Sequence, residues 1–276
     1  MKQYLDALED IYNNGYLHED RTGHGRKSLV GNMLKFNLSD GTLPIVTTRE
    51  INTNTLVAEL LWFISGSSDV QVLKDMGSEI WNRWAVKQEH IDAFIAELDF
   101  SHHEKPYEME EAIKIALTAQ FIDEIGPIYG PNWRHAPASQ ETQKMLYPLD
   151  MIPSDKLKAY EAVYREQNTI GDKTDFDQEE FAQYAMMEYT NTVDQLGLLI
   201  MNLKHRPYSS RHIVNAWIPE YIPYETMSPQ KNVLLGKGAL APCHMFFQCF
   251  VKPPQADGDR PELSLLIYIR FIIGCF

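Results

Sequence analysis

The sequence predicts an α+β protein, in which several strands occur together with interspersed helices. Before about Pro207, most patterned segments have the apolar spacing of helices. After Pro207 the pattern becomes strand-like, in the segments HIVNAW, HMFFQCFV and LSLLIYIRFII. Because strands and helices do not alternate regularly, the order argues against the βαβ units of a parallel sheet. The 276 residues, of which 44% are hydrophobic and 23% charged, suit one large globular domain or two small ones.

The N-terminal segment predicts a helix, a loop and then a strand. Apolar side chains at positions 4, 5, 8, 11 and 12 recur at helical spacing, and Gly15 is a typical helix stop. The loop EDRTGHGRKS follows, with two glycines and three basic residues. Met33–Leu38 alternates as a strand does, and SDGTLP predicts a turn.

Two further helices are expected before the middle of the chain. Thr53–Ile64 has the composition of a buried helix, which ends at Gly66. Asp69–Met76 predicts a short helix that is capped by the serines at 67 and 68.

The middle of the chain contains two segments of distinct composition, at about 86–125 and about 138–195. Both are rich in charged residues and have helical patterning. The string GPIYGPNWRHAP, dense in glycine, proline and aromatic residues, lies between them. The helical pattern continues through VDQLGLLIMNLKH and ends before the strands.

Charge and cysteine content narrow the class of protein. A net charge of −13 repels nucleic acid, so no nucleic-acid partner is expected. The three cysteines are too few for a disulfide framework and favour a reduced, cytoplasmic setting. The longest apolar stretches are interrupted by charges and are too short to span a bilayer, so no membrane partner is expected.

Two residues have the properties of reactive groups, and each has a plainer interpretation. Cys243 comes directly before a predicted strand, where it is either a nucleophile or a small buried hydrophobe. Glu59 is a carboxylate in an apolar helix, where it is either paired, protonated or functional, or else points out at a solvated edge of the helix.

Other candidates are weaker when taken alone. The loop around Arg21 offers basic side chains and glycine backbone to a phosphate, and Arg211 opens a strand. Trp81, Trp84 and Trp133 either stack on a flat ligand or belong to the core. The nine histidines have no metal-ligand spacing, so no metal site is expected.

Several of these strings occur together in one order, and in that order the chain resembles the family of thymidylate synthase and the deoxypyrimidine-monophosphate hydroxymethylases. The strings are DRTGHG, FNLSDG, ELLWFISG, IWNRWA, GPIYGPNWR, PYSSRHIVNAW and LAPCHMFFQCFV, and the resemblance covers about 1–85, 126–137 and 193–270. It implies a mixed sheet flanked by helices in a single domain. The segments at about 86–125 and 138–195 are then expected to be helical insertions.

The resemblance implies transfer of a one-carbon unit from 5,10-methylenetetrahydrofolate to carbon 5 of a deoxypyrimidine monophosphate. Cys243 matches the nucleophile that adds to carbon 6 of the pyrimidine. Glu59 matches the carboxylate that organises proton transfer, with His244 and Tyr129 beside it.

Binding residues are implied in the same way. Arg21, Arg211 and Arg270 match phosphate-binding arginines, and Arg211 is expected to be donated across the interface of a homodimer. Trp81 and Trp84 match the aromatic floor under the folate, and the position of Arg49 suits the cofactor's glutamate tail.

The sequence also departs from the family pattern. The family usually has two adjacent arginines before the HIVNAW strand, and here Ser210 replaces the first of them. Ile269, Phe271 and Ile273 occupy positions where polar partners are expected. The chain ends at Phe276, so we expect it to be either a truncated product or a shortened, inactive relative.

Three functions therefore remain open. The first is thymidylate synthase, which converts dUMP to dTMP. The second is a dUMP or dCMP hydroxymethylase, in which water captures the methylene group. The third is an inactive remnant that still forms dimers. A cytoplasmic location is expected, or the host cytoplasm if the protein is phage-encoded.

Overall fold

The computed structural model describes residues 2–18, 25–48, 50–137, 154–167, 169–170, 173–174, 192–256 and 259–269. Three predicted site residues, Arg21, Arg49 and Arg270, lie outside the described residues. Within the segment at about 138–195 that was expected to be helical, residues 177–189 lie outside them as well.

Helices make up most of the regular structure. The α-helices of the described residues are α1 (Lys2–Asn14), α2 (Thr53–Ser65), α3 (Val70–Asp75), α4 (Gln88–Ala96), α5 (Pro106–Phe121), α6 (Gly130–Arg134), α8 (Ser154–Gln167), α10 (Gln195–His205) and α11 (Pro229–Leu234), and the 3-10 helices are η1 (Asn82–Trp84) and η3 (Pro219–Tyr221).

The strands form small antiparallel ladders. They are β1 (Tyr16–His18) with β2 (Arg26–Ser28), β3 (Ala136–Pro137) with β6 (Thr192–Val193), β4 (Thr169–Ile170) with β5 (Lys173–Thr174), and the three-stranded sheet of β7 (Ile213–Asn215), β8 (His244–Lys252) and β9 (Glu262–Ile269). The α+β class is confirmed, and every ladder among the described residues is antiparallel.

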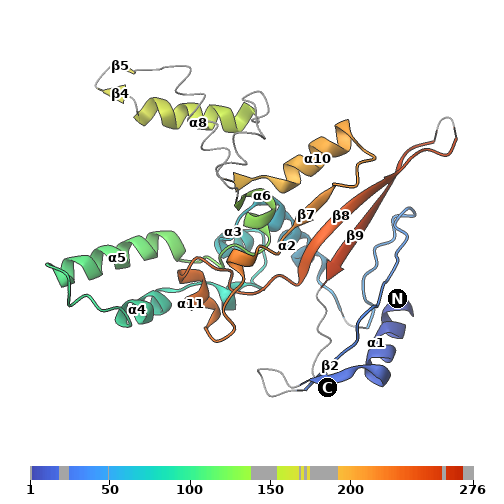
Figure 1. The fold of residues 1–276 in the computed structure, drawn as a ribbon, viewed down its shortest axis with the longest axis horizontal. Coiled ribbons are helices and arrows are strands. Elements are labelled where there is room, and N and C mark those ends of the chain that lie inside the picture. The colour runs from blue at the N-terminus through green and yellow to red at the C-terminus, as the bar shows by residue number, and fades with distance from the viewer. Residues whose placement is uncertain are drawn as a thin grey trace.

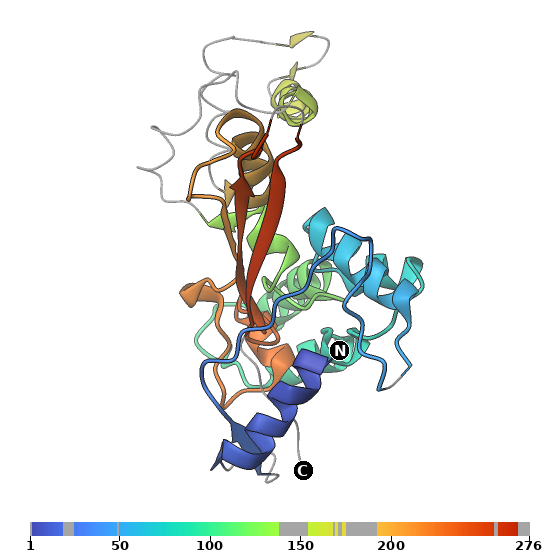
Figure 2. The same cartoon turned by 90° about the vertical axis from the view of Figure 1, so that its right-hand side faces the viewer.

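The three-stranded sheet is the main β element. Its register places Ile213 opposite Gln248 and His244 opposite Ile269. Strands β8 and β9 form a long hairpin, and α10 lies beside β7 (Figures 1 and 2). Helices α4 and α5 form a pair that projects from the other side of the molecule (Figure 1).

Most of the predicted helices are confirmed. Helix α1 covers the predicted N-terminal helix, and the amide of Gly15 donates to Ile11 O at 2.9 Å. Helix α2 is confirmed as a helix but not as a buried one, since Leu56, Val57 and Leu61 are each at least 50% exposed. It ends at Gly66, whose left-handed φ of 86° suits a residue without a Cβ. The cap of α3 is Asp69 instead of the serines at 67 and 68, because its carboxylate accepts the amide of Gln71.

The strand predicted over Met33–Leu38 is wrong. These residues belong to no ladder among the described strands, and most of them are exposed. The amide of Lys35 instead donates to Gln3 Oε1 at 2.9 Å, and Gln3 Nε2 donates to Lys35 O at 2.6 Å. An alternating pattern needs a partner strand, and here one glutamine side chain supplies the hydrogen bonds.

One core cluster holds the helices of the middle region together. It contains the fully buried Trp62 of α2, Leu73 of α3, Ile91 of α4, and Val214 of β7. The segment at 123–125 passes between these elements and exchanges backbone hydrogen bonds with residues 68, 70, 86 and 239. This segment leads directly into the GPIYGPNWR string and so fixes where that string lies.

Candidate active site

Tyr129 brings the start of helix α6 to the start of strand β8. Its hydroxyl accepts the backbone amide of Cys243 at 2.8 Å and that of His244 at 3.4 Å. Cys243 directly precedes β8, and His244 is the first residue of this strand. The structure therefore brings together three residues that the sequence proposed as catalytic.

The ring of Tyr129 is held in an aromatic cluster. Its centroid lies 4.5 Å from that of Phe63, 6.1 Å from that of Trp133 and 5.7 Å from that of His244. Burial raises the pKa of Tyr129 to about 12, although hydrogen bonds from the two amides oppose the shift. At neutral pH the hydroxyl therefore keeps its proton, and that proton remains available because both observed hydrogen bonds use the oxygen as acceptor.

Glu59 joins the same region through Trp81. The indole Nε1 of Trp81 donates to Glu59 Oε1 at 2.7 Å, and both residues are half-buried. Glu59 is therefore a partnered, half-buried carboxylate and does not simply point at a solvated edge. The negative charge of Glu59 acts on Tyr129 and His244: it raises the pKa of Tyr129 and opposes the lowering of the pKa of His244.

His244 keeps an exposed edge, and its ring packs beside Tyr129. Desolvation lowers the pKa of its imidazole, and the nearby Glu59 opposes this shift. The ring is therefore largely neutral at neutral pH, and a neutral imidazole can accept a proton at one nitrogen and donate one at the other.

The two described cysteines differ in access. Both are reduced thiols, but Cys243 is exposed and Cys249 is buried. Burial raises the pKa of the Cys249 thiol, which makes it a weak nucleophile. Cys243 is thus the thiol that a substrate can reach.

The three tryptophans proposed as stacking residues have different environments. Trp81 is half-buried and lies 6.1 Å from Phe63, while Trp84 is half-buried with the guanidinium of Arg83 4.1 Å from its ring centroid. Trp133 is buried in the core, as the alternative interpretation held. Trp81 and Trp84 therefore retain some exposed surface, and one face of Trp84 is occupied.

Arg211 is not part of this cluster. The pairing of Ile213 with Gln248 places Arg211 level with Phe250, seven residues along β8 from Cys243. At about 3.3 Å per residue this separation is roughly 20 Å. Ile269, the last residue of β9, lies opposite His244, so the described chain ends next to the site just before Arg270.

Sequence reasoning missed the residues that hold Tyr129 in place. The buried amide of Asn132 donates to the carbonyls of Ile128 at 2.6 Å and Ala216 at 2.9 Å. Gln195 Nε2 donates to Asn132 O at 2.7 Å and to Asn215 O at 2.8 Å. These bonds tie α6 to β7. The sequence did offer one signal for Asn132, which is a polar residue among the aromatic and apolar residues of GPIYGPNWR, because a buried polar side chain needs hydrogen-bond partners.

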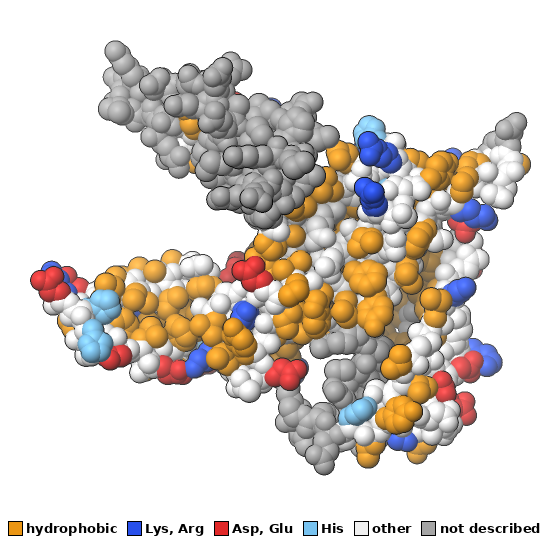
Figure 3. Space-filling view, in the orientation of Figure 1, with side chains coloured by type: hydrophobic (Ala, Val, Ile, Leu, Met, Phe, Trp, Pro, Cys, Tyr) orange, Lys and Arg blue, Asp and Glu red, His pale blue; other side chains and the backbone are white. Residues whose placement is uncertain are grey.

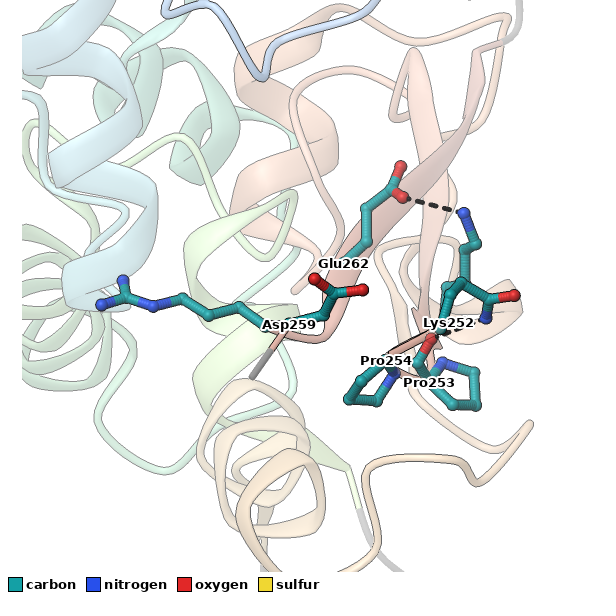
Figure 4. Close-up of a pocket in the computed structure, with 7 residues that line it drawn as sticks. Lys252, Pro253, Pro254, Asp259 and Glu262 are labelled. Atoms are coloured by element: carbon teal, nitrogen blue, oxygen red, sulfur yellow. Dashed lines mark hydrogen bonds and ion pairs between the residues drawn. The ribbon is translucent and has the colours of Figure 1, made fainter. Parts of the chain in front are cut away.

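A separate hollow lies at the turn between β8 and β9, at the opposite end of β8 from Cys243 (Figure 4). Its lining includes Lys252 and Glu262, which form an ion pair at 3.3 Å, and the prolines at 253 and 254. It contains none of the predicted site residues. We therefore regard the group formed by Tyr129, Cys243 and His244, with Glu59 and Trp81 beside it, as the candidate active site.

The described ranges also bear on metal binding and on membrane insertion. Within them, no three His, Cys, Asp or Glu side chains gather in a way that would hold a metal ion. No helix in the same ranges combines the length and the apolar character that crossing a membrane requires.

Known proteins resemble the chain over most of its length. The family model described as thymidylate synthase matches residues 2–272. A thymidylate synthase of Pseudomonas fluorescens (strain SBW25) is 27% identical over 270 residues, which cover 98% of this chain and 65% of the relative. A thymidylate synthase of Francisella tularensis subsp. holarctica (strain FTNF002-00 / FTA) is 31% identical over 251 residues, which cover 91% of this chain and 60% of the relative. The chain thus spans less than two thirds of the length of these relatives.

Proposed function

The chain belongs to the thymidylate synthase family, and from this premise we propose that it converts dUMP to dTMP. The one-carbon unit comes from 5,10-methylenetetrahydrofolate, which leaves as dihydrofolate. The observation that carries the proposal is the contact of Tyr129 with both Cys243 and His244, with Glu59 held nearby by Trp81. It supports the proposal because the reaction needs a nucleophile and proton-transfer groups in one place.

The nucleophile is the first requirement. Carbon 5 of the pyrimidine is too weakly nucleophilic to attack by itself, so the thiolate of Cys243 adds to carbon 6. The new S–C6 bond pushes the electron pair of the 5,6 double bond toward carbon 5 and the carbonyl oxygen at carbon 4, which activates carbon 5. After carbon 5 has gained its substituent and lost its proton, the S–C6 bond breaks and the thiolate is restored.

Proton transfer is the second requirement. Tyr129 holds its proton at neutral pH, His244 is largely neutral there, and Glu59 is fixed by its hydrogen bond to Trp81. We assign to these groups the removal of the proton from carbon 5 and the protonation of the departing folate, with Glu59 acting through water.

The folate supplies the one-carbon unit and the hydride that reduces it. Trp81 and Trp84 would form the aromatic floor under its rings, and their partial exposure fits this role. Because Arg83 covers one face of Trp84, a folate ring would have to use the other face or the ring of Trp81. Arg49 would meet the glutamate tail, and Arg21 and Arg270 would contact the phosphate of dUMP.

We also propose that the protein acts as a homodimer, with Arg211 donated to the site of the partner subunit. The support is a large apolar surface on the hairpin, where Leu263, Leu265, Ile267 and Ile269 of β9 are each more than two fifths exposed. Figure 3 shows apolar side chains gathered over the sheet. The distance of roughly 20 Å along β8 between Arg211 and Cys243 also suits donation to a partner.

The remaining parts of the proposal concern organisation and location. We propose one domain over residues 1–276 with helical insertions at about 86–125 and 138–195, and a cytoplasmic location. Helices α4, α5 and α8 fall within these two segments, which supports their helical character.

A product assay tests the proposed reaction. The protein is incubated with dUMP or dCMP and methylenetetrahydrofolate, and the products are identified by mass. A methylated base together with dihydrofolate supports thymidylate synthase, whereas a hydroxymethyl base with tetrahydrofolate supports the hydroxymethylase. Cys243→Ser should abolish turnover, and Cys249→Ala, at the buried thiol, should retain it. Absence of any product from the unaltered protein would contradict both enzymatic functions.

A further inference from the structure

The connection between α10 and β7, which we call the basic loop, carries Arg206 and Arg211, and Lys204 and His205 stand beside it in the last turn of α10. All four are exposed. Among the described residues, no carboxylate lies within ion-pair distance of them, although eleven other ion pairs are present. Basic side chains and a His gather where α10 ends, with no acidic side chain beside them (Figure 3). In a chain of net charge −13, two arginines on one short loop without a carboxylate partner make this loop a candidate site for an anionic ligand.

The backbone of this loop is fixed. The amide of Arg206 donates to Asn202 O at 2.7 Å, and the amide of Ser209 donates to Arg206 O at 3.0 Å. From β8, Gln248 Nε2 donates to Ser210 O at 2.8 Å. A loop held at so many points has little conformational entropy left to lose when a ligand binds.

A buried histidine adds the strongest constraint. His212 is only 1% exposed, and its Nε2 lies 3.1 Å from Arg206 O and 3.0 Å from Pro207 O. Because both neighbours are carbonyl oxygens, Nε2 carries the proton and donates it. This contact brings the backbone of Arg206 next to the residue that follows Arg211, so the two arginines flank one anchored point.

The chemistry of the two arginines favours a phosphate monoester. Such a group carries between one and two negative charges near neutral pH and presents three acceptor oxygens. A guanidinium matches those oxygens in a two-pronged geometry that an ammonium lacks. One arginine leaves part of this charge unpaired, and Ser210, which takes the place of a second arginine, is small and neutral.

We propose that Arg206 supplies the second guanidinium, so that Arg206 and Arg211 together bind the phosphate of the nucleotide in the site of the partner subunit. The inference rests on the proposed function, since it assigns one more binding residue to the same substrate. It implies that the cation missing at Ser210 is provided from the other end of the same loop.

Titration calorimetry of the protein with dUMP and with deoxyuridine tests this assignment, because only dUMP has the phosphate. Arg206→Gln should weaken dUMP binding by about tenfold to a hundredfold, which is the usual range for one charge-assisted contact, and should leave deoxyuridine binding unchanged. Ser210→Arg in the Arg206→Gln background should restore most of the affinity for dUMP. Lys204→Gln is the matched control, because it removes the same charge from the neighbouring helix end, and it should change binding by less than about threefold.

The outcomes separate this assignment from the proposed function. An unaltered protein that does not bind dUMP contradicts the proposed function and, with it, the assignment. An unaltered protein that binds dUMP while Arg206→Gln binds it equally well overturns the assignment alone. Equal losses in Lys204→Gln and Arg206→Gln would also overturn it, because the effect would then come from the general positive charge of this region.

Discussion

Replacing Tyr129 by Phe removes one buried hydroxyl and keeps the ring, so it separates the chemistry of the site from its packing. The hydroxyl accepts two backbone amides and, with a pKa of about 12, holds its own proton at neutral pH. The substitution therefore removes a proton-transfer group while leaving Cys243 and Glu59 in the protein. We expect a large loss of turnover with a small loss of stability.

The loss of stability follows from the lost contacts. The 2.8 Å bond from the amide of Cys243 is worth about 0.5–1.5 kcal/mol, and the 3.4 Å bond from His244 is worth less. The ring contacts with Phe63 and Trp133 remain, so the change stays below the roughly 3–5 kcal/mol of deleting a buried aromatic side chain. We expect the free energy of unfolding to fall by about 1–2 kcal/mol, which lowers Tm by about 2–6 °C.

The loss of activity should be far larger. A group that transfers protons contributes about 100- to 10,000-fold to the rate, so kcat for dTMP formation should fall within that range. Urea unfolding and a dTMP assay on the same preparation measure both effects. Tyr221→Phe is the matched control, because Tyr221 is half-buried and its hydroxyl makes no hydrogen bond to the described residues. Unchanged kcat in Tyr129→Phe would refute the chemical role of the hydroxyl.

Three further substitutions test the residues that support the site. Gly126→Ala should destabilise the protein by more than about 2 kcal/mol, because its φ is 71° and an added Cβ would lie 2.2 Å from a backbone oxygen. Gly77→Ala is the control and should cost only about 1 kcal/mol, because Gly77 has a φ of 87° but an added Cβ would meet no atom within 4 Å. Equal losses of the two variants in urea unfolding would contradict this reasoning. Burial raises the pKa of Glu124 above its usual 4.5, so the stability that the protonated carboxyl contributes is full below that value and is lost as the pH rises through the folded pKa. The stability of Glu124→Gln relative to the unaltered protein should therefore increase as the pH rises above 4.5. Urea unfolding at several pH values measures this difference, and a constant difference would argue against the effect. Asn132→Ala leaves several buried carbonyls without their donor and should cost about 2–4 kcal/mol, while a loss under 1 kcal/mol would mean that water replaces the amide.

Local patterns predicted the parts of the fold that local physics decides. The helices at 2–14 and 53–65 could be predicted from their apolar residues and from the glycine that follows each of them, Gly15 and Gly66. The position of Cys243 immediately before a strand could also be read from the sequence, since HMFFQCFV is rich in strand-forming residues. The strand expected at Met33–Leu38 failed because a strand exists only with a partner, and an alternating pattern does not identify one.

The contacts that make the site depend on residues far apart in the chain. Tyr129 meets the amide of Cys243 across 114 positions, and Trp81 meets Glu59 across 22. Periodicity within one segment carries no information about such pairs, although the residue types in the site could be named in advance. The supporting bonds of Asn132 and Gln195 were missed for the same reason, since their partners are backbone carbonyls of other segments.

Covalent capture of a substrate analogue tests the central claim most directly. Incubation with 5-fluoro-dUMP and methylenetetrahydrofolate blocks release of the proton from carbon 5, because fluorine replaces it, so the S–C6 bond persists. Intact mass followed by peptide mapping should find one nucleotide and one folate attached at Cys243, and no adduct in Cys243→Ser. An adduct at Cys249, or no adduct in a protein that binds dUMP, would contradict the role of Cys243 as the nucleophile.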